Sequence, residues 1–99
     1  MLTYNRTFEF TMHGIEKIYI RKMRYNDAKI HFRNEIEKFF FRGHQYIEVI
    51  HGIGTYTLRK MVLDEVININ YVQIIENNNP GSLVLELQIP DINTLKKYT

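Results

Sequence analysis

The residues with the clearest chemical potential are a histidine, two glycines and two cations close together in the chain. His51, Gly52 and Gly54 follow a short β-rich run, and Arg59 and Lys60 fall in the first turn of the helix expected next. A glycine-containing turn that precedes a helix places backbone N–H groups next to the positive N-terminal end of the helix, and this arrangement favours binding of an anion. Cations in a first helical turn are mildly unfavourable unless an anionic ligand balances them. The pattern therefore predicts bare amides and a guanidinium that hold a phosphate.

A second histidine, His13, extends this chemistry to hydrolysis. His13 ends an expected strand and could meet His51 at neighbouring strand ends, where two imidazoles could stabilise a phosphate or transfer a proton. Glu9 is the candidate carboxylate, on the same strand face as Thr11 but about 7 Å further from the loop. Each histidine is also typical of an ordinary strand end, and Glu9 of a solvated position. Binding with or without cleavage therefore stays open.

Other residues complete a candidate nucleic-acid site. Tyr56 could stack on a base or sugar, and Arg42 and His44 could touch a backbone phosphate. No pair of histidines has zinc spacing with a third ligand, so no bound metal or cofactor is predicted, and Mg²⁺ or Mn²⁺ is expected only for a nuclease. A dinucleotide fingerprint fails because Thr57 stands where a third glycine is needed. The candidate binding residues are Gly52, Gly54, Thr55, Tyr56, Arg59, Lys60, Arg42 and His44.

The composition is that of one ordinary globular domain. The 99 residues are 44% hydrophobic and 24% charged, with a net charge of +2 and no cysteine. Disulfides, a thiolate nucleophile and a zinc finger are thereby excluded. The beginning of the sequence lacks a signal-peptide pattern and no apolar run is long enough for a membrane span, so a cytoplasmic location is expected. Residues 1–42 carry nine Lys or Arg against five Asp or Glu, which places the positive half before the glycine turn.

Hydrophobic periodicity predicts the elements that position these residues. Residues 8–13 alternate as a half-buried strand, whereas residues 15–25 are predicted to be irregular. Asn26 is the expected N-cap and Gly43 the expected C-cap residue of an amphipathic helix. Its apolar stripe is Ala28, Phe32, Ile36, Phe39 and Phe40. The predicted elements are strand 8–13, helix 28–41, strand 47–50, helix 58–69, strand 71–76, turn 77–82 and strand 83–89.

This order predicts an α/β fold. The first two strands should be parallel through a right-handed crossover and the last two antiparallel. Two helices cannot cover both faces of four strands, so we expect a two-layer sandwich, βαβαββ, with both helices on one face of a mixed sheet. The other face should be polar and partly acidic. Nucleic acid should therefore engage the loops at the carboxyl ends of the first two strands.

Two motifs at these strand ends resemble the Smr (small MutS-related) domain family. Residues 10–14 (FTMHG) are similar to its Leu-Asp-Leu-His-Gly signature, and residues 51–55 (HGIGT) followed by Leu58 and Arg59 to its His-Gly-x-Gly and Leu-Arg signature. Residues 79–87 (NPGSLVLEL) look like a third. The resemblance implies a fold similar to the C-terminal domain of translation initiation factor three. It also implies nucleic-acid binding, with nicking endonuclease activity on DNA or RNA in some members.

The resemblance divides the chain into a 1–7 extension, an 8–89 Smr-like domain and a 90–99 tail. Three departures stand out: Thr11 replaces the signature Asp, Tyr56 replaces a common glycine, and residues around 15–22 look like an insertion. The loss of the Asp weakens a nuclease more than a binder. The competing hypothesis is a non-catalytic interaction or dimerisation module, a monomer or weak homodimer in which an edge strand such as Leu83–Ile89 pairs with a second copy.

Overall fold

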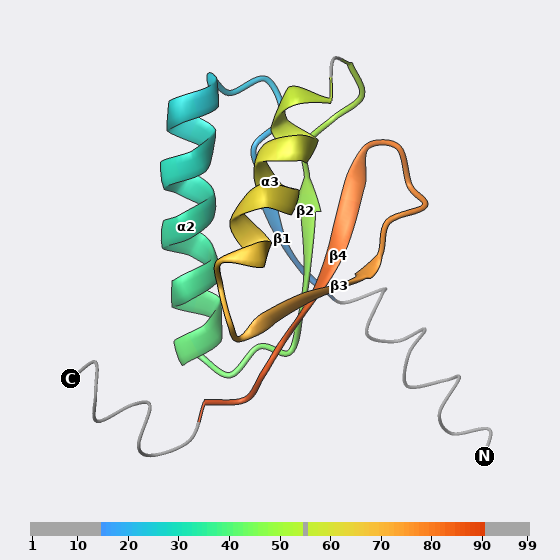
Figure 1. Cartoon of the computed structure of the whole chain (residues 1–99). Coiled ribbons are helices and arrows are strands. Elements are labelled where there is room, and N and C mark those ends of the chain that lie inside the picture. Colours follow the sequence, from blue (N-terminus) through green and yellow to red (C-terminus); the bar gives the residue numbers. More distant parts are fainter. Residues whose placement is uncertain (1–14, 55, 91–99) are drawn as a thin grey trace.

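The chain folds as two layers, with a four-stranded sheet on one side and two helices on the other (Figure 1). The computed structural model describes residues 15–54 and 56–90. The predicted order of strand, helix, strand, helix, strand, strand is confirmed. The elements are β1 (Glu16–Tyr19), α2 (Tyr25–Phe41), β2 (Tyr46–Ile50), α3 (Thr57–Ile67), β3 (Val72–Glu76) and β4 (Ser82–Leu87).

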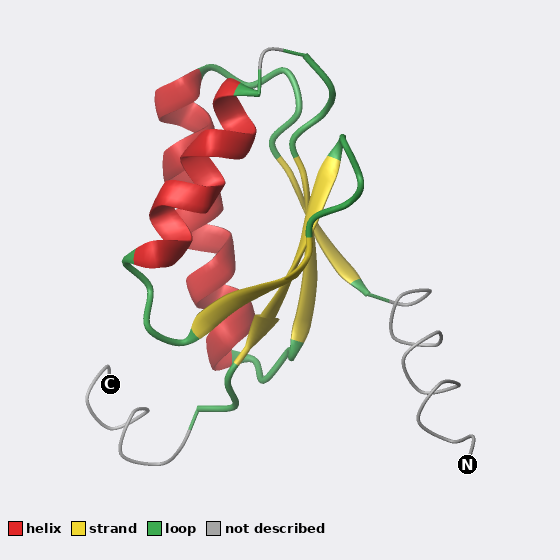
Figure 2. Ribbon diagram, turned by 45° about the vertical axis from the view of Figure 1, so that its right-hand side comes forward, coloured by secondary structure: helices red, strands yellow, loops and turns green. Residues whose placement is uncertain are grey.

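The strands lie in the order β1-β2-β4-β3, and both helices cover the same face of the sheet (Figure 2). β1 is parallel to β2, and β4 is antiparallel to both of its neighbours, so β1, β2 and β3 run in one direction. The predicted two-layer mixed sheet is therefore confirmed. The suggestion that Leu83–Ile89 forms an edge strand is wrong, because β4 lies inside the sheet and its backbone groups are already paired on both sides.

The first strand lies in the segment that we predicted to be irregular. Expected strand 8–13 falls outside the described residues, and the strand paired with β2 is Glu16–Tyr19. Ile18 lies beside Val49 in the register, and the Ile20 N–H continues the ladder to the Ile50 carbonyl at 3.0 Å. Ile18 and Ile20 are buried two positions apart with exposed Tyr19 between them, which is the strand periodicity.

Helix α2 presents its predicted apolar stripe to the sheet, and all five stripe residues are buried. Its N-cap, Arg24, lies two residues before the expected one, so the assignment of Asn26 is wrong. Gly43 ends the helix as predicted, with φ +82°. The N–H of Gly43 bonds the Phe40 carbonyl and the N–H of His44 bonds the Phe39 carbonyl, both at 3.1 Å, which is a Schellman ending.

The open face of the sheet is polar, as expected. The Glu86 carboxylate accepts hydrogen bonds from Gln73 at 2.8 Å and Gln45 at 3.2 Å, and Glu48 accepts one from the Ser82 hydroxyl at 2.8 Å. Neutral donors thus satisfy two carboxylates that would repel a polyanion. Neither described helix combines the length and the apolar character that crossing a bilayer requires.

A buried carboxylate joins the two helices. Glu65 of α3 is 6% exposed; its Oε1 lies 2.5 Å from Arg33 Nε and its Oε2 3.5 Å from Lys29 Nζ, both on α2. Both cations remain partly exposed to water, so they can pair with the buried carboxylate without losing all of their own hydration. This pairing explains how a charged residue can occupy the core side of α3.

We expect Glu65→Gln to lower the free energy of unfolding by about 1–2 kcal/mol, because the amide cannot replace two charge-assisted interactions while both cations can return to water. Urea denaturation would measure the change. Asp64→Asn is the matched control, since its pair with Lys60 is exposed and should be worth about 0.5 kcal/mol or less. Equal decreases for the two variants would contradict this account.

Candidate nucleic-acid interface

Three connections meet at one end of the sheet, which we call the loop end. They follow β1 (20–24), β2 (51–56, residue 55 not being described) and β3 (77–81). Because β1, β2 and β3 are parallel to one another, their carboxyl ends share this edge, at the top of Figure 1. Both helices also begin here. The topology therefore gathers the glycine turn, the third signature and the connection after β1 into one surface.

The glycine turn does not offer the bare amides that we predicted. The N–H groups of His51 and Gly52 both donate to the Gly81 carbonyl, at 3.0 and 2.9 Å. Asn79 Oδ1 in turn accepts from the Gly81 N–H at 2.7 Å, which tightens the β3–β4 connection. The prediction is wrong for Gly52, whose amide holds two loops together. Gly54 lies further along the turn with open space where a Cβ would be.

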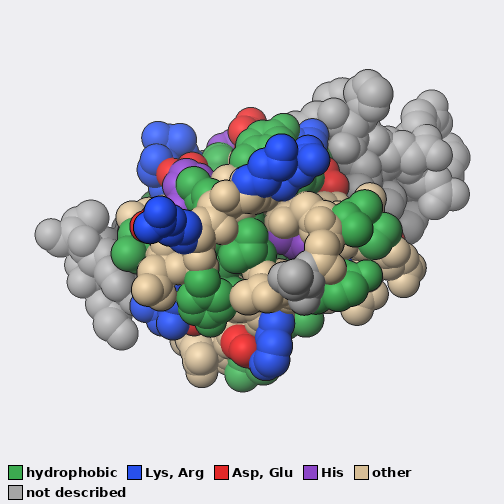
Figure 3. Space-filling model, turned by 90° about the horizontal axis from the view of Figure 1, so that it is seen from above, with side chains coloured by type: hydrophobic (Ala, Val, Ile, Leu, Met, Phe, Trp, Pro, Cys, Tyr) green, Lys and Arg blue, Asp and Glu red, His purple; other side chains and the backbone are tan. Residues whose placement is uncertain are grey.

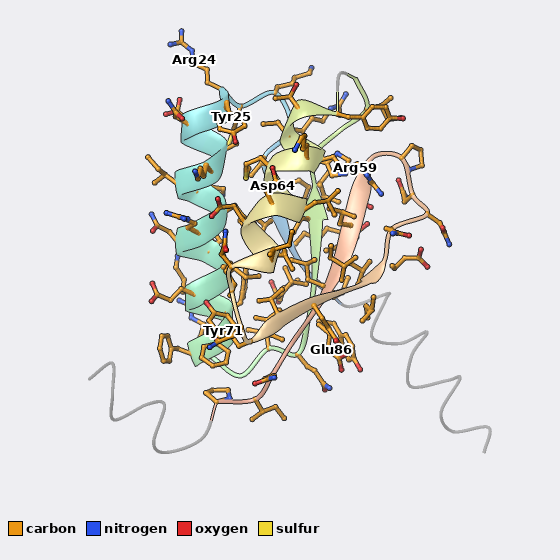
Figure 4. The ribbon with its side chains drawn as sticks, viewed as in Figure 1. Arg24, Tyr25, Arg59, Asp64, Tyr71 and Glu86 are labelled. Atoms are coloured by element: carbon orange, nitrogen blue, oxygen red, sulfur yellow. The ribbon has the colours of Figure 1, made fainter. Side chains whose placement is uncertain are left out.

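Arg59 fastens the same two loops from the side. Its Nη2 donates to the Asn77 carbonyl at 2.6 Å (Figure 4). Its Nη1 lies 3.2 Å from the Asn79 carbonyl and 3.4 Å from the Ser82 carbonyl. The guanidinium that was expected to meet a phosphate is thus directed at backbone oxygens of its own chain.

The His51 side chain is part of this fastening. It is 5% exposed; its Nδ1 lies 2.8 Å from the Gly52 carbonyl and its Nε2 lies 3.1 Å from Arg59 Nη1. A carbonyl needs a donor and a guanidinium needs an acceptor, so the ring is neutral with its proton on Nδ1. Burial lowers the pKa of His51 below its usual 6.5 and the Arg59 charge lowers it further, against the opposing effect of the Gly52 carbonyl. Both ring nitrogens are engaged in holding the loop.

A cleft of about 230 Å³ opens beside this fastened turn. The residues that line it include Arg21 and Lys22 after β1, and Tyr56 and the start of α3. None of the described residues that line it is Asp or Glu. A second hollow, of about 380 Å³, shares Arg21, Gly52 and Ile53 with the cleft but is also lined by Glu48. Figure 3 looks down on this end, where Lys and Arg side chains appear at several points around the face. The cleft is therefore the side that suits an anion.

Arg21, which follows β1, lies beside Gly52. A Cβ on Gly52 would lie 2.8 Å from Arg21 Cγ, so the arginine stem rests against the bare glycine backbone. Within the described part of the chain, the side chains of Arg21, Lys22 and Arg24 make no hydrogen bond or ion pair. These three cations, which the sequence reasoning missed, are available to a ligand. The alternation of Ile18 and Ile20 just before them was the signal that could have found them.

Two residues at the cleft have left-handed backbones without being glycine. Lys22 has φ +67° and Tyr56 has φ +63°. A side chain in this conformation typically costs about 1–2 kcal/mol relative to the right-handed form. Both side chains are exposed and both line the cleft.

The remaining candidates do not join this cluster. Arg42 and His44 follow the C-terminus of α2, about 25 Å of helix away from the loop end, and His44 packs edge-on against Phe39. Lys60 is in the first turn of α3 but pairs with Asp64 at 3.1 Å. Glu9, His13 and Thr55 lie outside the described residues. Among the residues that are described, no three His, Asp or Glu side chains converge as metal ligands would.

A two-layer α/β domain with a fastened glycine loop and a basic rim is the class that this fold and site define. The chain belongs to the Smr domain family, whose model matches residues 18–82. The crystal structure of the Smr domain of Thermus thermophilus MutS2 shares the fold, with a TM-score of 0.65 and 16% sequence identity over 75% of this chain and 99% of that one. No curated protein matches the sequence.

The family match begins at Ile18, so residues 10–14, where we placed the first signature, lie outside it. We infer that Leu-Asp-Leu-His-Gly corresponds instead to residues 18–22, where buried isoleucines occupy the two Leu positions and the positive φ of Lys22 suits a glycine. Tyr19 then stands in place of Asp and Arg21 in place of His. The supposed insertion at 15–22 is the first strand itself.

The neutral, buried state of His51 predicts a pH effect on stability. Because its folded-state pKa is lowered, the unfolded chain binds more protons below pH 6.5, so His51's contribution is present above that pH and is lost as the pH falls. We expect the free energy of unfolding of the wild type to fall more steeply than that of His51→Gln between about pH 7.5 and about pH 5.5. Urea denaturation across this range would measure it, and parallel pH profiles would contradict it.

Proposed function

We propose that this domain binds nucleic acid through the cleft at the loop end and does not cut it. Membership of the Smr family supports a nucleic-acid partner. The single observation that carries the proposal is the pair Arg21 and Lys22, which line a cleft in which no described residue is Asp or Glu and whose side chains make no hydrogen bond or ion pair within the described part of the chain. Phosphate oxygens are the natural partners of such cations, and contacts of this kind supply affinity without sequence preference.

The distribution of charge supports this site over the rest of the surface. The open sheet face holds Glu48 and Glu86, and the second hollow includes Glu48. A strand entering the cleft would meet Arg21 and Lys22, and neither Glu48 nor Glu86 is among the residues that line it. Arg59 would serve the site indirectly, by fixing the turn that separates the two hollows.

The absence of cutting is supported by what stands at the first-strand signature. Tyr19 and Arg21 replace the Asp and His, and neither residue can accept a proton readily at neutral pH. His51 is a positioning residue here, since Nδ1 bonds a carbonyl and Nε2 faces Arg59. The competing hypothesis, that Glu9 and His13 hydrolyse phosphodiesters with Mg²⁺ or Mn²⁺, predicts activity that depends on residues before β1.

We expect wild-type binding to labelled single and double strands to weaken steeply with salt, because displaced counterions are released from the phosphates. The variant Arg21→Gln/Lys22→Gln should bind more weakly, and its log–log salt slope should be flatter by about 0.7–0.9 for each phosphate that is no longer neutralised. Fluorescence anisotropy would measure both effects.

Lys38→Gln is the matched control for this titration. Lys38 lies near the C-terminal end of α2, where it pairs with Glu35, and its replacement changes the net charge without touching the cleft. Its salt slope should equal that of the wild type. If Lys38→Gln weakened binding as much as the double variant, general charge rather than the cleft would explain the affinity.

For cutting, we expect labelled RNA and supercoiled plasmid to remain intact under conditions in which gel shifts show them bound, with or without Mg²⁺ or Mn²⁺. The physical reason is that the described residues of the cleft offer no available proton acceptor. Cleavage that Glu9→Gln or His13→Ala abolished would overturn this expectation and establish the hydrolytic hypothesis.

A further inference from the structure

We propose that Lys22 and Tyr56 form a clamp that selects single-stranded nucleic acid, with the Tyr56 ring stacking on an unpaired base and Lys22 and Arg21 holding the adjoining phosphate. This inference rests on the proposed function and deepens it by naming the substrate class. Two residues with left-handed backbones that line one cleft, in which no described lining residue is Asp or Glu, carry it.

The backbone itself makes these positions unusual. A left-handed backbone is most readily adopted by glycine, and the family's signatures have glycine where Lys22 and Tyr56 stand. Here each position retains the conformation but carries a long side chain that stays in solvent. Strained residues persist where the surroundings hold them, and they gather at binding sites. Neither side chain fills the core, so packing does not explain them.

The exposure of the aromatic ring points to a ligand with an open face. Tyr56 is 54% exposed, and it caps α3 without making a side-chain cap hydrogen bond. Tyr56 lines the same cleft as Lys22 and Arg21, so a ring and two cations border one hollow. Base stacking with adjacent phosphate contacts is the general chemistry of single-strand recognition. A duplex interior cannot supply it, because its bases are already stacked on one another.

The turn between the two walls also favours a flexible strand. Ile53 is 78% exposed at the tip of the turn, between the cleft and the second hollow. A strand leaving the cleft would pass an apolar tip before it approached Glu48. A rigid duplex would have to meet that protruding turn as a whole, whereas a single strand can follow the cleft alone.

The test compares strands that differ only in their bases. Wild-type protein is titrated with short oligothymidine, with an abasic strand of equal phosphate number, and with a blunt hairpin duplex, at one salt concentration. We expect oligothymidine to bind about tenfold or more tightly than the abasic strand, in line with the contribution of a base–aromatic stack. The hairpin should bind about as weakly as the abasic strand.

Tyr56→Gly and Tyr56→Phe then locate the effect. Tyr56→Gly should lose the preference for bases while its Tm stays equal or rises, because glycine relieves the left-handed strain. Tyr56→Phe keeps the ring and should keep the preference. An RNA version of the oligonucleotide shows whether the sugar matters.

The outcomes separate the two proposals. If wild-type protein binds none of the three probes at low salt, the proposed function fails. If it binds all three equally, or if Tyr56→Gly retains the preference for bases, the clamp is refuted while phosphate binding stands. Because the comparison of oligothymidine with the abasic strand uses only wild-type protein, equal binding of the two would refute the clamp even if a variant failed to fold, and Tyr56→Phe against Tyr56→Gly assigns any preference to the ring.

Discussion

The loop end depends on one carbonyl oxygen and one guanidinium. The Gly81 carbonyl receives the N–H groups of both His51 and Gly52, while Arg59 holds the carbonyls of Asn77 and Asn79. The bonds to Gly81 join segments that are about thirty residues apart in the chain. They fix the position of the turn after β2 relative to the β3–β4 connection. Backbone N–H and C=O groups that are removed from water need hydrogen-bond partners, and here the two loops provide partners for each other. Without this reciprocal bonding, the walls of the cleft would have no fixed separation.

That fastening changes the meaning of the histidine and the arginine. In the sequence, His51 and Arg59 look like an acid–base group and a phosphate ligand. In the fold, each one uses its polar atoms on the other or on backbone oxygen, so both hold the turn in place. The cations of the connection after β1 make no such bonds in the part of the chain that the structure describes. The loop end therefore has two parts: a hydrogen-bonded base formed by His51, Gly52 and Arg59, and a rim formed by Arg21 and Lys22.

Local patterns predicted the framework well, because burial on one face leaves a period in the sequence. The stripe of α2, the ending at Gly43 and the interior-facing leucines of β4 follow from that period alone. The first strand was misplaced because residues 8–13 alternate more cleanly than Ile18 and Ile20 do, although the latter pair beside β2. The fastening of Gly52 to Gly81 could not be predicted, because a hydrogen bond between distant loops leaves no local period. Once the first strand was misplaced, Arg21 and Lys22 were missed with it.

Glycine is retained at position 52 and absent at 22 and 56, although all three have positive φ. The difference lies in what surrounds each Cβ position. At Gly52 a Cβ would meet the Arg21 stem at 2.8 Å, so strain and collision would add together. Lys22 and Tyr56 extend into solvent, where strain alone opposes a side chain and a ligand contact can offset it. The arginine that replaces the signature histidine therefore makes Gly52 indispensable for a new reason: the bare backbone accommodates its stem. The rim of the cleft can thus carry side chains at positive φ, whereas its base at Gly52 cannot.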